Sequence, residues 1–151
     1  MKRNFNYKKA SLIILVLFLA FQFYQPSRNM DNNPVVNTDF IQVYNPPAKV
    51  KQILLTSCYS CHSNNTHYQW FDYIQPGRAL VEYHIRQAKK DLNFNEWGNY
   101  FDLKQDRLLG SIKTQVEKKE MPLRSYTWFH TEARLTDAQR KILINWITKQ
   151  Q

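Results

Sequence analysis

The chain has 151 residues, of which 43% are apolar and 15% aromatic, so its length fits one domain and its composition excludes a disordered protein. Three glycines and six prolines exclude collagen-like and low-complexity proteins. The formal net charge is +9, and the two cysteines, Cys58 and Cys61, lie too close in sequence for a disulfide that would staple a domain.

The first segment of the chain has the layout of a secretory signal. Four basic residues come first: Lys2, Arg3, Lys8 and Lys9. An unbroken apolar run, Leu12–Phe21, follows them, and the positive charges are expected to stay in the cytoplasm. A helix over 7–24 would rise roughly 27 Å, close to the hydrocarbon thickness of about 30 Å. We therefore predict an uncleaved single-pass anchor over 1–25 in the inner (cytoplasmic) membrane, with the remaining chain on the periplasmic side. A cleaved signal is the alternative.

The charge of the remaining chain excludes one class of partner. Without those four residues, 17 basic residues stand against 12 acidic ones, a net charge of +5. The basic residues alternate with acidic ones, as in the segment 117–120. Such mixing is typical of a solvated helix face, so no nucleic-acid partner is expected, whereas an acidic protein partner is permitted.

Beyond the apolar run, we predict a linker over 26–45 and a domain over 46–151. The linker is rich in asparagine and lacks periodicity, although apolar residues in its second half could lie along the domain surface. In the domain, apolar residues recur with helical spacing and predict helices over 48–57, 77–90 and 103–119, with a short helical turn over 94–100. Thr136 is the predicted N-cap of the last helix. The expected fold of this domain is all-α.

The cysteines belong to a motif with a specific chemistry. The segment Cys58-Tyr59-Ser60-Cys61-His62 is C-x-x-C-H, the pattern for attachment of haem c. Two thiols one helical turn apart can add to the two vinyl groups of one porphyrin, and the adjacent histidine then donates a nitrogen to the iron. Export fits this cofactor, because such attachment is made on the translocated side of the membrane.

Three other interpretations of the motif remain. A thioredoxin-like redox pair requires a strand before the motif and a sheet around it. A zinc site could use both cysteines, His62 and His67, but neighbouring ligands such as Cys61 and His62 seldom chelate together. The third alternative is a small structural disulfide or a pair of idle thiols.

Met121 is the candidate for a second iron ligand downstream of the motif. Met121 lies 59 residues after His62, past a predicted helix and before Pro122, which fixes the loop. Its neighbours are charged, so a core role is unexpected there and we predict that Met121 ligates the iron. His84, His130, His67 and an open iron position are the alternatives. An aromatic cluster is expected to wall the porphyrin or to pack at helix junctions: Tyr68, Trp70, Phe71 and Tyr73. Arg78 is a candidate to bind a haem propionate.

Several separated motifs occur in an order that matches one family. They are Cys58–Phe71, Leu92–Trp97, Met121-Pro122 with Tyr126 and His130 behind it, and Leu135–Trp146. Together they resemble the bacterial haem-binding domain family of exported c-type cytochrome-like proteins, from about Pro46 to the end. The resemblance implies covalent haem on Cys58 and Cys61, with His62 as proximal and Met121 as distal ligand. The chain departs from the family at 68–71, where Tyr-Pro-Trp-Tyr is replaced by Tyr-Gln-Trp-Phe.

These residues predict an electron carrier. His/Met ligation saturates the iron and raises its potential, which favours one-electron transfer over the binding of small ligands. The expected partner is an exported or membrane redox protein, and no catalytic residue is assigned. A peroxidase-like enzyme or a gas sensor is the alternative, with an open sixth position beside His84 and Arg78 or Arg86. A haem-binding module for assembly or adhesion is a third hypothesis.

Overall fold

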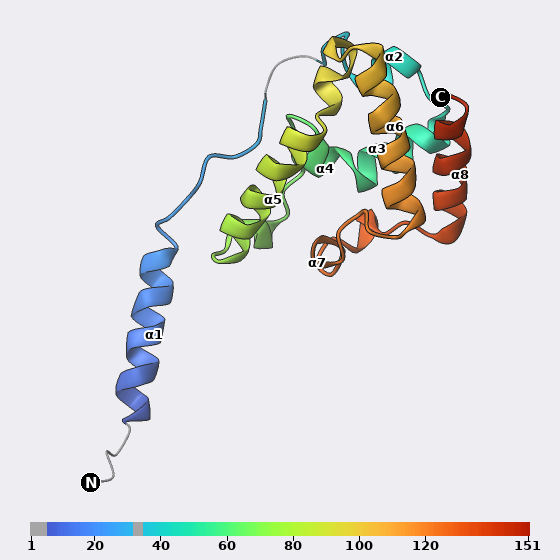
Figure 1. Ribbon diagram of the computed structural model, residues 1–151. Coiled ribbons are helices and arrows are strands. Elements are labelled where there is room, and N and C mark those ends of the chain that lie inside the picture. The colour runs from blue at the N-terminus through green and yellow to red at the C-terminus, as the bar shows by residue number, and fades with distance from the viewer. Residues whose placement is uncertain (1–5, 32–34) are drawn as a thin grey trace.

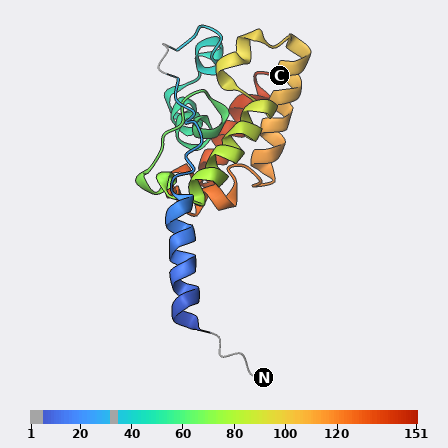
Figure 2. The ribbon, with the colours of Figure 1, turned by 90° about the vertical axis from the view of Figure 1, so that its left-hand side faces the viewer.

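The computed structural model describes residues 6–31 and 35–151. In these two ranges every regular element is a helix and none is a strand, which confirms the all-α prediction for them. One isolated antiparallel bridge joins Met30 to Asn65. Figures 1 and 2 show a body of short and medium-length helices, from which a single N-terminal helix projects.

The projecting helix is α1 (Tyr7–Phe21). It begins at Asn6, whose side chain accepts a hydrogen bond from the backbone N–H of Lys9. Its apolar side chains are largely exposed, and Gln22 follows as the C-cap. Hydrogen bonds between the side chain of Gln22 and the backbone of Gln75 connect the end of α1 to the helical body.

The predicted membrane anchor is wrong. Within residues 6–31 and 35–151, every helix is too short or too polar to cross a membrane. Helix α1 ends at Phe21, together with the apolar run. Its 15 residues rise about 22 Å, which is less than the hydrocarbon thickness of about 30 Å. The predicted single-pass location in the inner membrane is therefore wrong as well. Lys2 and Arg3, which were expected to orient the anchor, lie outside the described residues.

The segment predicted as a linker makes many contacts with the body. Helix α2 (Phe40–Tyr44) is capped by Asp39, whose carboxylate accepts from the N–H of Ile41, and Phe40 and Ile41 are buried. Farther upstream, Asn29 donates to the carbonyl of Ser63 and to the hydroxyl of Thr66. Residues 32–34 of this segment lie outside the described part of the chain.

Helix α3 (Ala48–Ser57) has the predicted bounds and leads directly into the cysteine motif. Pro47 precedes it, and its buried face consists of Val50, Ile53 and Leu54. Cys58 ends α3 and caps α4 (Tyr59–His62), a single turn that contains Cys61 and His62. The motif is therefore placed on the end of a helix that is held in the core.

The remaining elements follow the predicted order. The longer helices are α5 (Gly77–Asp91), α6 (Asp102–Glu117) and α8 (Asp137–Thr148). Thr136 caps α8 as predicted, because its hydroxyl accepts from the N–H of Gln139 while the Gln139 side chain accepts from the N–H of Thr136. Short elements lie between them: η1 (Trp70–Tyr73), η2 (Phe94–Asn99), α7 (Arg124–Thr127) and η3 (Thr131–Ala133).

The core lies where α2, α3, α6, α8 and η2 meet. Helix α8 packs against both α6 and α3, and α2 packs against η2. Phe40 is fully buried among aromatic side chains, with Trp97 at 4.7 Å and Phe94 at 5.0 Å between ring centroids. Helix α4 packs against both α3 and α5, and the cavity lies beside it.

Candidate functional site

A large apolar cavity surrounds the cysteine motif. It has two lobes of about 370 and 270 Å³, one against α5 and α7 and the other against α6. Counted together, these volumes fall in the range of roughly 300–1,000 Å³ that is typical of ligand and cofactor sites. Five residues line both lobes: Ser57, Cys58, His62, Met121 and Pro122.

Both cysteines are free thiols at the wall of the cavity. Burial raises the pKa of Cys58 to about 12, and burial together with the charge of Asp72 raises the pKa of Cys61 to about 11. A thioredoxin-like pair and a zinc site both use thiolates, so neither is favoured by this environment. In residues 6–31 and 35–151, no strand precedes the motif and no three His, Cys, Asp or Glu side chains are grouped to hold a metal ion.

His62 presents one ring nitrogen for coordination. Its Nδ1 lies 3.1 Å from the carbonyl oxygen of Leu92, and because a carbonyl only accepts, Nδ1 holds the proton. Nε2 is then left with its lone pair, as iron ligation requires. Burial lowers the pKa of His62, although the hydrogen bond to Leu92 opposes this, so the ring is neutral. Leu92 is the C-cap of α5, so the end of that helix orients the ring.

Met121 lies in the turn after α6. The backbone N–H of Met121 donates to the carbonyl of Gln115, and Arg140 donates to the carbonyl of Met121 at 3.2 Å, so the turn is held from two sides. Of the competing histidines, His84 on α5 lines the larger lobe, whereas His67 is exposed.

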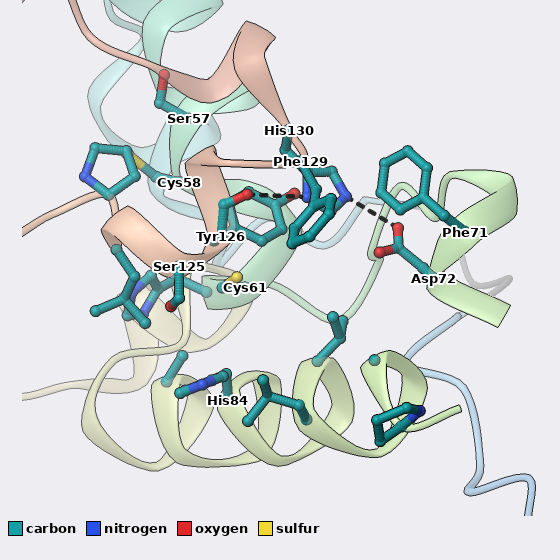
Figure 3. Close-up of a pocket in the computed structure, with 18 of the residues that line it drawn as sticks. Ser57, Cys58, Cys61, Phe71, Asp72, His84, Ser125, Tyr126, Phe129 and His130 are labelled. Atoms are coloured by element: carbon teal, nitrogen blue, oxygen red, sulfur yellow. Dashed lines mark hydrogen bonds and ion pairs between the residues drawn. The ribbon is translucent and has the colours of Figure 1, made fainter. Parts of the chain in front are cut away.

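His130 is excluded as an iron ligand by its own hydrogen bonds. The side chain is 3% exposed, and its Nε2 lies 2.9 Å from Oδ2 of Asp72. Its Nδ1 lies 3.3 Å from the carbonyl oxygen of Tyr126. Figure 3 shows both interactions at the cavity wall, above His84 and beside Cys61. Because both ring nitrogens are engaged, neither is free for a metal.

Sequence reasoning missed Asp72. The carboxylate is 3% exposed, lines the cavity and accepts from the N–H of Gln69 at 2.7 Å as well as bonding His130. A lone aspartate between aromatic residues has no periodicity or motif that marks it. The 58 positions that separate it from His130 conceal the pair in the sequence.

The aromatic residues expected at the porphyrin divide into two groups. Trp70 and Phe71 line the cavity. Tyr68 and Tyr73 instead lie against the guanidinium of Arg78, at 5.3 and 5.5 Å from their ring centroids. Arg78 is 2% exposed, donates to the carbonyl of Pro26 and pairs with Glu82 at 3.3 Å, so it is committed to the protein interior and not to a propionate.

The chemistry of these side chains fits a haem group. The walls are apolar, two thiols lie one helical turn apart, and a neutral imidazole with a free Nε2 adjoins them. Cys58, Cys61, His62 and Met121, all predicted from the sequence, border this one cavity.

Comparison with known families agrees with this cavity. A family model described as "Haem-binding domain" matches residues 16–149, from within α1 to just past α8. Neither the curated proteins nor the solved structures contain a significant match. The family match covers most of the chain and includes every residue of the cavity. The chain belongs to the haem-binding domain family.

Proposed function

We propose that this haem-binding protein holds haem c covalently through Cys58 and Cys61, ligates the iron with His62 and Met121, and passes single electrons. The observation that supports it most directly is the position of the two ligands. His62 and Met121 both lie at the junction of the two lobes, whereas His84 borders the larger lobe. His62 and Met121 would hold the iron of a bound haem there, and Cys58 and Cys61 would hold its porphyrin.

This ligand set determines the class of chemistry. When bound, the group supplies one-electron redox chemistry, and the protein contributes ligand identity, burial and hydrogen bonding. Leu92 orients His62, Arg140 holds the Met121 turn, and the apolar walls exclude water. An iron with both axial positions filled favours electron transfer over ligand binding.

Of the acid–base groups named for the peroxidase-like alternative, His84 borders the cavity, whereas neither arginine does. That alternative needs a positively charged or titratable side chain beside an open iron position. Arg78 is buried in its pair with Glu82, and Arg86 lines a separate basic pocket with Lys89 and Lys90. The proposed partner is a redox protein, and the formal net charge of +9 permits an acidic docking surface on it.

Covalent attachment is tested by haem staining after denaturing electrophoresis. The wild-type band should stain, because a thioether bond survives unfolding. The double variant Cys58→Ser, Cys61→Ser should lose the stain, whereas Ser57→Ala, at the same cavity wall, should keep it. A wild-type protein that releases all its haem on denaturation would refute covalent attachment.

The distal ligand is tested with Met121→Ala, with His84→Ala as the matched control. Loss of the methionine sulfur should abolish the far-red absorbance band of the oxidised protein, open the iron to carbon monoxide and lower the reduction potential. The His84 variant should keep the wild-type spectrum. An unchanged spectrum in Met121→Ala, or a change confined to His84→Ala, contradicts the assignment.

A further inference from the structure

A buried ion pair with no part in haem attachment lies at the wall of the haem cavity. Asp72 on η1 and His130, before η3, are each 3% exposed and 2.9 Å apart. The ring of Tyr126 stacks on the His130 ring at 3.9 Å between centroids, and Phe71 meets it edge-on at 5.2 Å. Figure 3 shows the pair on the same side of the cavity as the Cys61 thiol.

Hydrogen bonding determines how many protons the pair holds. The carbonyl of Tyr126 only accepts, so His130 Nδ1 carries a proton. The contact between Nε2 and Oδ2 needs a second proton, and Oδ2 already accepts from the N–H of Gln69. An ionised Asp72 beside a fully protonated His130 satisfies all of these bonds, and the pair is then neutral overall.

We propose that the Asp72–His130 pair binds a proton when the haem is reduced, so that electron uptake by this protein is coupled to proton uptake. The inference rests on the proposed electron-transfer function and adds a proton to it. One electron comes from a one-electron donor, and one proton comes from solvent. The proton forms the N–H bond at Nε2 of His130, and no other covalent bond of the protein changes.

Charge explains the coupling. A deprotonated His130 leaves the Asp72 carboxylate uncompensated, so the wall of the cavity has a net charge of −1. That charge stabilises the oxidised haem, which has one more positive charge than the reduced haem. Protonation of His130 neutralises this negative charge and so favours reduction of the haem. Since both groups are buried, solvent screens this interaction weakly.

The other ionisable groups near His130 favour the protonated ring. Burial lowers its pKa, but Asp72, the Tyr126 carbonyl and Glu132 together raise it by more, so the net pKa lies above the ordinary value. The remaining titratable groups at this side are Tyr126 and Cys61, whose pKa values are raised by burial, and His84 across the cavity. His84 is therefore the side chain that the experiment must separate from His130.

The expected size follows from Coulomb's law. At an effective dielectric constant of about 20, two unit charges on the order of 10 Å apart change the proton affinity of either site roughly tenfold. For a one-electron couple, a tenfold change corresponds to a shift of about 59 mV. The midpoint potential should fall by this amount as the pH rises through the pKa of His130 in the oxidised and then in the reduced protein.

The experiment is a spectroelectrochemical titration of the haem-loaded full chain over a series of pH values. His130→Gln should flatten the pH dependence, and Asp72→Asn should move its onset to lower pH, because the carboxylate that holds the proton is gone. His84→Gln and the exposed His67→Gln should both keep the wild-type profile. Proton release on oxidation, followed with a pH-indicator dye, should decrease in His130→Gln.

Two results would overturn the inference. One is a wild-type potential that does not change with pH, and the other is a pH dependence that persists unchanged in His130→Gln. A profile that disappears in His84→Gln assigns the proton to His84 and also refutes it. Because bound haem has a measurable potential whether or not it is covalently attached, failure of the covalent proposal is recognised separately by the stained gel.

Discussion

Replacement of Phe40 by alanine tests whether residues outside the predicted domain belong to its core. Phe40 is 0% exposed, and four aromatic rings surround it at centroid distances of 4.9, 5.0, 4.7 and 5.8 Å: Tyr44, Phe94, Trp97 and Trp146. A buried Phe→Ala change costs about 3–5 kcal/mol of unfolding free energy. Aromatic pairs add roughly 0.5–1.5 kcal/mol each beyond the buried area, without being additive. We therefore expect a loss of about 4–5 kcal/mol in Phe40→Ala.

The assay is urea unfolding followed by far-ultraviolet circular dichroism, with both proteins in the same haem-loaded state. Val43→Ala is the matched control, because Val43 lies on the same helix and is 45% exposed, so its cost should stay within about 0.5 kcal/mol. An unchanged slope with urea would show that the difference is one of stability. A cost below about 1 kcal/mol for Phe40→Ala would refute the packing of α2 into the core.

Three further changes test other parts of the structure. Glu82→Gln leaves the buried Arg78 without its charged partner and should cost about 3–5 kcal/mol in urea unfolding, whereas a neutral result would contradict the pair. Thr136→Ala removes the capping box of α8 and should lower the unfolding free energy by about 1 kcal/mol in thermal melts, unless α8 begins elsewhere. Burial lowers the pKa of His130, but Asp72 and its other neighbours together raise it by more, so this pair stabilises the fold below the ordinary histidine pKa of about 6.5. That stability is lost as the pH rises through the folded-state pKa of His130. Urea unfolding of the haem-free chain over a series of pH values should show this loss. The same loss in His130→Gln would refute the assignment to His130.

Features that depend on neighbouring residues were predictable from the sequence. Helix α3 has the predicted bounds, and Thr136 caps α8, because helical periodicity and capping involve residues within one or two turns. The predicted haem-attachment motif Cys58–His62 is equally local, since it needs two thiols and an imidazole on a single turn of helix. The family match confirms haem binding, whereas covalent attachment and the Met121 ligand stay proposals.

Features that depend on distant segments required the tertiary structure. The segment expected to be a linker buries Phe40, since an apolar residue between polar ones reveals its partners only when α2 meets η2. The length of α1 was overestimated, because the predicted helix continued past the apolar run to Tyr24, whereas α1 ends at Phe21. The same limit applies to Asp72 and His130, which form a hydrogen bond across 58 positions. The sequence determined which cofactor this chain is expected to bind, because the motif that predicts it consists of adjacent residues. Only the folded chain decided which buried groups surround it, because burial and pairing are properties of packing.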